Sequence, residues 1–322
     1  MAVTLLHGRE ALAWGAANGG ASFFAAASLA AAGMDGALAE ETRTRGGAVV
    51  DAGSAAAALS AALDAAVRGA VSVAALGGGD LPSAAPLIAR AVRERVPLVI
   101  LVEGAWTGSA VEPEGAAQRE LSLLRWISDP APALYAPASA DEAYALARAA
   151  ALAARAGGAP VGLYLDAALA SLREPVETAE ARDAVPSRGG AALPAAAALP
   201  ALAALPEAEL YRTRDASVLA VAAGIAARAA RTAVRVARER GTRAGLIRLI
   251  RLWPLPDAEL AASAERAQRV VVAELNEGQL WEPLAARLHS GERRPVVRSL
   301  AEPGAGALPP ERILAALLDE AA

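Results

Sequence analysis

The first half of the chain alternates between short apolar runs and longer stretches in which apolar residues recur at helical spacing. Continuous apolar runs are typical of parallel strands that are buried on both faces. We expect such strands at residues 22–26, 48–52, 70–75, 97–102, 133–136 and 160–165. Helices are predicted between them at residues 9–18, 34–43, 54–67, 82–95, 115–126 and 140–155. This alternation predicts right-handed βαβ units around a parallel sheet.

Proline interrupts the pattern between residues 174 and 213, at positions 175, 186, 194, 200 and 206. An irregular run of about 40 residues is uncommon inside a compact domain. We therefore interpret residues 174–213 as a linker between a first domain at residues 1–173 and a second domain at residues 214–322.

The alternation restarts after the linker and predicts a small four-stranded α/β domain. Strands are expected at residues 217–222, 244–250, 269–274 and 295–300, and helices at residues 224–240, 257–266, 278–288 and 310–318. The helix at 224–240 carries a stripe of arginines, which is either an anion-binding face or a solvated surface. The neighbouring apolar stripe favours the solvated surface. The stripe consists of Arg228, Arg231, Arg235 and Arg238.

Composition excludes several classes of function. The net charge of −4 argues against a nucleic-acid partner, and the absence of cysteine excludes a thiolate zinc site or an iron–sulfur cluster held by this chain. Two distant histidines, His7 and His289, argue against a metal site. Residues 21–33 are too short and alanine-rich to span a membrane and lack the basic start of a signal peptide. We expect a cytoplasmic protein.

Two segments of the second domain resemble a known family. Residues 248–256 read RLIRLWPLP at the end of one expected strand, and residues 274–280 read ELNEGQL at the end of the next. The pair resembles the α subunits of 2-oxoacid:ferredoxin oxidoreductases, in which one strand leads into W/F-P-F/L-P and a later one ends in E-x-N-x-G-Q. These are thiamine-diphosphate enzymes.

The first domain carries further matches in the family's order. Residues 5–16 read LLHGREALAWGA and precede FFA at 23–25, which looks like the family's L-x-G-N-E-A-x-x-x-G-A…F-F-A-G-Y-P start. Short strings at 125–126, 136–139, 142–144 and 160–161 echo later segments. The resemblance implies an α/β protein, with a pyrimidine-type parallel-sheet domain of thiamine-diphosphate enzymes followed by a smaller transketolase C-terminal-like α/β domain.

The resemblance also implies an activity and partners. The family carries out coenzyme A-dependent oxidative decarboxylation of a 2-oxoacid such as pyruvate or 2-oxoglutarate, and passes the electrons to ferredoxin. Its α subunit contacts the pyrimidine ring of thiamine diphosphate and the 2-oxoacid carboxylate. A β subunit holds the diphosphate with Mg²⁺ and an iron–sulfur cluster. A hetero-oligomer with a β-type subunit is therefore expected.

Three positions at which the resemblance places reactive side chains differ here. The family's substrate-binding Thr falls on Ala30, and the Glu that serves the thiamine pyrimidine falls on Ala55. Alanine cannot supply the acid–base group that this Glu provides. The family's substrate-binding Arg falls on Glu103, which replaces attraction of a carboxylate by repulsion of about 1–4 kcal/mol. All three positions lack the reactive side chain of the family, which indicates a family scaffold whose site has lost its catalytic groups.

The remaining candidates carry weaker signals. Asp51 is the carboxylate nearest to Ala55 and would need a gap of four residues to replace the missing Glu; otherwise it forms an Asx turn or caps the next helix. Thr107 and Gly108 keep the Thr-Gly pair of the family's R-G-G-P-S-T-G loop and are the candidate cofactor-binding residues. The glycines at 77–79 are interpreted as a tight turn.

Other conspicuous residues favour structural roles. We interpret His7 as a residue at a helix start or an interface and His289 as a cation near a helix end. Tryptophans are interpreted as interface packing, namely Trp106, Trp126, Trp253 and Trp281. Three polar residues that follow a strand are interpreted as subunit or domain contacts, namely Glu274, Asn276 and Gln279.

Two functions remain open at this point. The first is an α-type subunit that works with a β partner, and the second is a non-catalytic structural or regulatory paralogue that binds the same partner. A β chain of a 2-oxoacid dehydrogenase shares the second domain, but W-P-L-P followed by E-x-N-x-G-Q argues against it.

Overall fold

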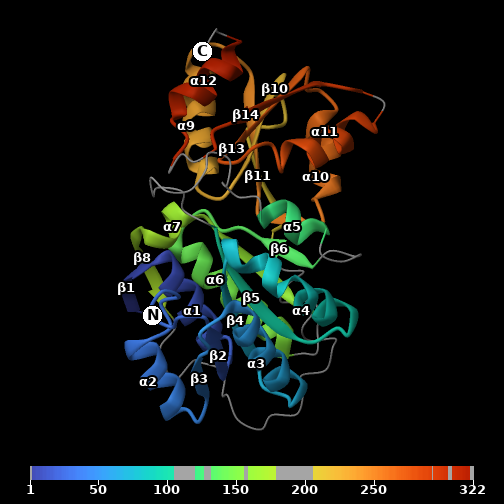
Figure 1. The fold of residues 1–322 in the computed structure, drawn as a ribbon. Coiled ribbons are helices and arrows are strands. Elements are labelled where there is room, and N and C mark those ends of the chain that lie inside the picture. The colour runs from blue at the N-terminus through green and yellow to red at the C-terminus, as the bar shows by residue number, and fades with distance from the viewer. Residues whose placement is uncertain are drawn as a thin grey trace. The chain divides into compact units, whose positions relative to one another are not determined.

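The computed structural model describes residues 2–104, 120–126, 132–155, 159–178, 206–291, 293–303 and 307–319. The described residues divide into two compact units, the first from residues 2–104 and the described part of 123–178, and the second from residues 120–122 and the described part of 206–319. Both units are α/β (Figure 1). No helix within the described ranges is both long enough and apolar enough to cross a bilayer.

The first unit contains the predicted parallel sheet. Its strands lie in the order β6-β7-β5-β4-β2-β3 and pair in parallel. They are β2 (Phe23–Ala26), β3 (Ala48–Asp51), β4 (Ser72–Gly77), β5 (Leu98–Glu103), β6 (Ala133–Tyr135) and β7 (Val161–Leu165). The central strands β5 and β7 are buried along almost their whole length, as a sheet covered on both faces requires.

Helices cover this sheet. The packing of the first of them explains Gly15 in the motif at residues 5–16. The helices are α1 (Gly8–Asn18), α2 (Gly36–Thr44), α3 (Ala55–Val67), α4 (Leu81–Arg93), α6 (Ala140–Arg155) and α7 (Ala167–Ser171). A further short helix, α5 (Glu120–Trp126), has residues in both units. Helix α1 packs along α6 (Figure 1), where a Cβ on Gly15 would lie 2.2 Å from the carbonyl oxygen of Tyr144. Only glycine permits this close crossing.

A two-stranded antiparallel ribbon was not predicted. Strand β1 (Ala2–His7) pairs with β8 (Arg173–Thr178), so that His7 lies opposite Arg173. Pro175 and charged residues hide β8 in the sequence because a ribbon needs only one buried face. Strand β8 occupies the first residues of the segment interpreted as a linker, and residues 179–205 of that segment lie outside the described ranges.

The sheet that the structure describes in the second unit has five strands, so the prediction of a four-stranded domain was wrong. The order is β14-β13-β10-β11-β9, in which only β9 runs antiparallel to its neighbour. Strand β9 reads AELY and escaped notice because it is short, charged and at the end of the expected linker. The strands are β9 (Ala208–Tyr211), β10 (Val218–Ala223), β11 (Ala244–Leu249), β13 (Arg269–Glu274) and β14 (Val296–Ala301), with a short β12 (Arg251–Trp253) after β11.

The predicted helices of the second unit are confirmed. Helices α9 (Ala226–Glu239) and α12 (Pro310–Leu318) pack together against the sheet (Figure 1), while α10 (Asp257–Ala264) contacts β11 and α11 (Trp281–His289) contacts β14. The alanines of α9 form the core with β10, β11 and α12. Small side chains let this helix lie close to the sheet, which makes alanine the main core residue here.

Candidate functional site

The carboxyl edge of the parallel sheet in the first unit gathers most of the candidate positions. Ala30 is exposed in the loop after β2, Asp51 ends β3, Ala55 begins α3 and Glu103 ends β5. Ligands of open α/β sheets bind beyond the carboxyl ends of the strands. The structure therefore places these four residues at the edge where a site is expected.

Ala55 leaves the start of α3 without an acidic group. It is 3% exposed and follows Ser54, whose Oγ accepts a hydrogen bond from the Ala57 amide at 3.2 Å. The N-cap of this helix is therefore Ser54, and the alternative that Asp51 caps the helix is wrong. A buried methyl group stands at the start of α3.

Asp51 links two loops of the same edge. Its side chain is exposed, and Oδ2 accepts a hydrogen bond from the Leu29 amide at 3.4 Å. The backbone next to it is tied to the same loop, because the Gly53 amide donates to the Ala27 carbonyl at 3.1 Å. Asp51 thus holds the loop at 27–35 against the end of β3.

Glu103 has an arginine partner that the sequence analysis missed. The Nη2 atom of Arg9, in the first turn of α1, lies 2.8 Å from Oε1 of Glu103, and both side chains are about 30% exposed. The sequence interpretation expected Glu103 to repel a carboxylate, but the ion pair neutralises its charge locally. The signal that could have revealed Arg9 is that two predicted departures from the family pattern carry opposite charges, since the resemblance sets Arg9 against an Asn and Glu103 against an Arg.

Arg9 ties four segments together at this edge. Besides Glu103, its guanidinium donates to the Ala31 carbonyl at 3.2 Å and to the Ser171 hydroxyl at 3.3 Å. The loop at 27–35 also touches the stem of this side chain, since a Cβ on Gly33 would lie 3.0 Å from Arg9 Cγ. Gly33 has φ +65°, a conformation that glycine adopts without strain.

Burial has a larger effect on the pKa of the Glu103 carboxyl than the charge of Arg9 has. Desolvation raises the pKa of Glu103 above its usual value, and the nearby Arg9 charge offsets part of this effect.

His7 is the N-cap of α1 and lies next to Ser171. Its amide donates to Glu10 Oε2 at 2.8 Å, and its Nδ1 lies 2.9 Å from the Ser171 carbonyl oxygen.

The E-x-N-x-G-Q segment forms a buried structural turn. Glu274 is 2% exposed, and its carboxylate accepts hydrogen bonds from the Leu280 amide at 2.8 Å and the Trp281 amide at 3.2 Å, at the start of α11. Asn276 is fully buried, and its Oδ1 accepts from the amides of Gly278 and Gln279. Burial raises the pKa of Glu274 to about 7, against the lowering effect of its hydrogen bonds.

This geometry corrects the interpretation of the segment as a subunit contact. Glu274 and Asn276 are buried inside the second unit, and Gln279 Oε1 accepts from the Glu277 amide at 2.7 Å. Their side chains satisfy amides of their own turn, which explains why the pattern requires these residue types. Trp253 is likewise buried, at 3% exposure, and precedes the cis-proline Pro254.

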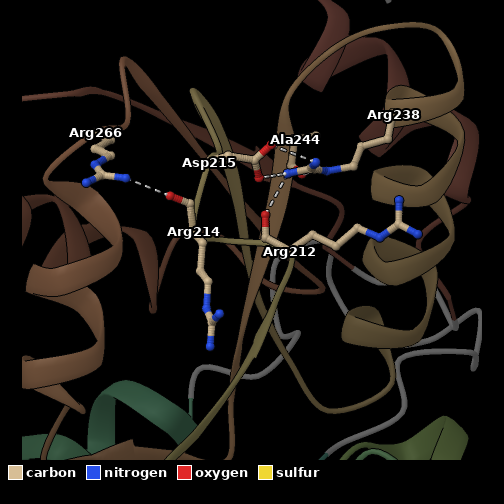
Figure 2. A network of polar contacts seen from close by, with 6 residues as sticks. All are labelled: Arg212, Arg214, Asp215, Arg238, Ala244 and Arg266. Carbon is tan, nitrogen blue, oxygen red and sulfur yellow. Dashed lines mark hydrogen bonds and ion pairs between the residues drawn. The ribbon is translucent and has the colours of Figure 1, made fainter.

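The arginine stripe on α9 is engaged by acidic and carbonyl groups of its own unit. Arg231 pairs with Glu209, and Arg235 pairs with Glu239 at 2.7 Å. Figure 2 shows Arg238 reaching the Asp215 carboxylate and the carbonyls of Arg212 and Ala244. The Arg238 guanidinium lowers the pKa of Asp215. The structural interpretation of the stripe therefore agrees with these contacts.

A cavity lies at residues of α10 and α11 and of the segments that follow them. Its volume is about 520 Å³, and its lining includes Leu260, Leu288, Arg266 and Arg287. Both arginines have partners, because Arg266 donates to the Arg214 carbonyl (Figure 2) and Arg287 to Asp257. Within the described residues no group of His, Cys, Asp and Glu is arranged to hold a metal ion.

Several candidates fall outside the described residues. Trp106, Thr107 and Gly108 belong to the range 105–119, and the side chain of Trp126 is not described. The cofactor-binding role of Thr107 and Gly108 stays a prediction.

Sequence comparisons find relatives of the second unit. Residues 216–313 match the family pyruvate:ferredoxin oxidoreductase core domain II. The 2-oxoglutarate synthase subunit KorA of Methanothermobacter thermautotrophicus is 41% identical over 69 residues, which are 21% of this chain and 18% of the relative. The ketoisovalerate oxidoreductase subunit VorB of the same organism is 39% identical over 85 residues, 26% of this chain and 24% of the relative. The chain thus aligns with a minor part of each curated relative.

Solved structures share the fold over more of the chain. A 2-oxoglutarate:ferredoxin oxidoreductase from Magnetococcus marinus, with 2-oxoglutarate, coenzyme A and succinyl-CoA bound, has a TM-score of 0.80 at 18% identity and covers 98% of this chain and 65% of that chain. A split-gene transketolase, an inactive β4 tetramer, has a TM-score of 0.69 at 18% identity and covers 98% and 97%. The predicted α/β fold class is confirmed. The chain is thus similar to 2-oxoacid:ferredoxin oxidoreductase subunits, and residues 216–313 of its second unit match pyruvate:ferredoxin oxidoreductase core domain II.

Proposed function

We propose that the chain is the α-type subunit of a 2-oxoacid:ferredoxin oxidoreductase complex and assembles with a β-type subunit in the cytoplasm. The match of residues 216–313 to core domain II carries this proposal, and the named relatives act on 2-oxoglutarate and ketoisovalerate. In this proposal the β-type subunit holds Mg²⁺, the diphosphate of thiamine diphosphate and an iron–sulfur cluster, and ferredoxin takes the electrons.

The residues at the carboxyl edge do not fit the pyrimidine side of thiamine diphosphate. A carboxyl group is needed there for proton transfer, and the start of α3 offers the buried methyl of Ala55. Asp51 is engaged by the Leu29 amide and exposed. No catalytic step can therefore be assigned to these side chains.

This mismatch favours a second candidate function, a non-catalytic structural or regulatory paralogue that binds the same β-type subunit. The pairing of Glu103 with Arg9 points the same way, because it removes a free cation from the edge where a 2-oxoacid carboxylate would bind. Both candidates share the partner and differ in turnover.

Co-expression with a β-type subunit encoded in the same genome tests the proposal. We expect the two chains to co-purify and to elute together in size-exclusion chromatography. Turnover is followed as 2-oxoacid-dependent viologen reduction in the presence of thiamine diphosphate and coenzyme A. Failure to form any complex would contradict both candidates.

The turnover of the unmodified complex distinguishes the two candidates, and the variant Ala55→Glu tests whether the missing carboxyl is what prevents catalysis. If only the missing carboxyl prevents catalysis, Ala55→Glu in the complex raises viologen reduction at least about 100-fold, the scale of one acid–base group. Ala57→Glu, an exposed position on the same helix, is the matched control and should have no effect. Full turnover by the unmodified complex would exclude the non-catalytic paralogue.

A further inference from the structure

Arg9 lies in an unusual setting for an ion-paired surface residue. It stands beyond the carboxyl ends of parallel strands, where ligands of open α/β sheets bind. Its guanidinium donates to a carboxylate, a main-chain carbonyl and a hydroxyl that come from three separate segments of the chain. An arginine held in this way is oriented before any ligand arrives, which is how carboxylate-binding arginines are arranged.

Glu103 contacts this arginine through the carboxylate at the end of its side chain. The main chain of Glu103 is fixed in the sheet between Gly77 of β4 and Leu165 of β7. The part of the side chain beyond Cβ is one methylene and one carboxylate, the same heavy atoms as acetate. The strand therefore presents the equivalent of a small carboxylate to Arg9.

We infer that the Glu103 carboxylate is an internal ligand of Arg9 and fills a position that otherwise takes a small external carboxylate such as a 2-oxoacid. The loop at 27–35 contacts the Arg9 side of the pair, through the Ala31 carbonyl and the closeness of Gly33 to the Arg9 stem. The description of this position as a substrate site rests on the proposed function. The carboxylate affinity of Arg9 does not.

Chemical rescue tests the inference on the full chain without a partner. Glu103→Ala removes the atoms of acetate and leaves Arg9 without its carboxylate. We expect the melting temperature of this variant to rise by roughly 2–4 °C in about 100 mM sodium acetate relative to the same concentration of sodium chloride. The unmodified chain, in which Glu103 occupies the position, should shift by less than about 0.5 °C.

Two controls separate a site from a general salt effect. Arg9→Ala combined with Glu103→Ala should lose the acetate effect, because the guanidinium is absent. Glu94→Ala removes the acidic partner of Arg90 in an exposed pair on the helix surface and should show no rescue. An acetate effect of equal size in all three variants would overturn the inference.

A second cavity variant guards against misfolding. If Glu103→Ala is insoluble, Glu103→Ser creates nearly the same gap and is expected to show the same rescue, whereas the isosteric Glu103→Gln fills the gap and should show none. Absence of an acetate shift in a folded Ala or Ser variant would refute the internal ligand.

Pyruvate in place of acetate tests the class of ligand. We expect a shift at least as large as that of acetate in Glu103→Ala, because the carboxylate is the group recognised. Rescue by acetate without rescue by pyruvate would overturn a 2-oxoacid position. Because these measurements use the isolated chain, their outcome is independent of whether a β-type subunit co-purifies.

Discussion

At the scale of single residues, three side chains that bear charge satisfy main-chain groups within their own unit. Glu274 accepts from two amides, Arg9 donates to the Ala31 carbonyl, and Arg238 donates to the carbonyls of Arg212 and Ala244. Each of these residues closes a loop against a helix. In these three cases the charged side chain fixes a loop, a role that a residue type alone does not reveal.

Arg238 provides a residue-scale prediction. Arg238→Ala should lower the free energy of unfolding by about 1–3 kcal/mol, because two carbonyl acceptors and the Asp215 carboxylate lose their donor. Arg235→Ala, which breaks an exposed pair one turn away, should change it by less than about 0.5 kcal/mol. Urea unfolding measures both values. Equal values would show that the network in Figure 2 does not hold the loop after β9.

At the scale of elements, helix starts decide where the candidate residues lie. Helix α3 begins at Ala55 because Ser54 caps it, and helix α1 begins at Gly8 because His7 and Glu10 bond across its first turn. The sequence predicted α3 to within one residue but assigned Asp51 either to an Asx turn or to the cap of this helix, and did not consider Ser54. Capping is a local hydrogen bond that depends on the backbone angles at the helix start, which the sequence does not give.

The cap of α3 supplies an element-scale prediction. Ser54→Ala should destabilise the chain by about 1 kcal/mol, since the Ala57 amide loses its acceptor. Ser60→Ala, an exposed position inside the same helix, is the control and should be neutral or slightly stabilising, because alanine has the higher helix propensity. Thermal unfolding followed by circular dichroism compares the two. A larger loss for Ser60→Ala would contradict Ser54 as the cap.

The pattern of apolar residues predicted some strands of this chain and missed others. The buried parallel strands were predicted because each is a continuous apolar run, whereas β1, β8 and β9 were missed. Each of these three pairs antiparallel at an edge or in a ribbon. Such strands need only one apolar face, so Pro175 and the charged residues of β8 and β9 were interpreted as part of a linker.

At the scale of the whole molecule, the dependence of stability on pH should follow Glu274. Its pKa is about 7 in the folded chain and near 4.5 in the unfolded chain, so between these values the folded state holds a proton that the unfolded state has released. Stability is therefore greatest below pH 4.5 with respect to this group, and about 3 kcal/mol of it is lost as the pH rises to about 7.

Glu274→Gln isolates this contribution. Relative to the unmodified chain, the variant should gain about 3 kcal/mol of stability between pH 4.5 and pH 7.5, because it has no proton to lose. Urea unfolding at several pH values measures the difference. The raised pKa of Glu103 acts in the same direction and remains in the variant, while the lowered pKa of Asp215 acts only at more acidic pH. Parallel curves for the two chains would contradict the assignment.

The sequence alone determined the α/β class, the buried strands and the likeness to 2-oxoacid:ferredoxin oxidoreductase subunits, because these depend on periodicity and on short strings of adjacent residues. The assignment of Ala30, Ala55 and Glu103 to the family's site positions stays a prediction. Only the tertiary structure decided that Arg9, 94 positions away, pairs with Glu103 and that Glu274 and Asn276 are buried in their own turn. Hydrogen bonds and ion pairs join residues through space, and the order of residues along a chain does not encode such distances directly.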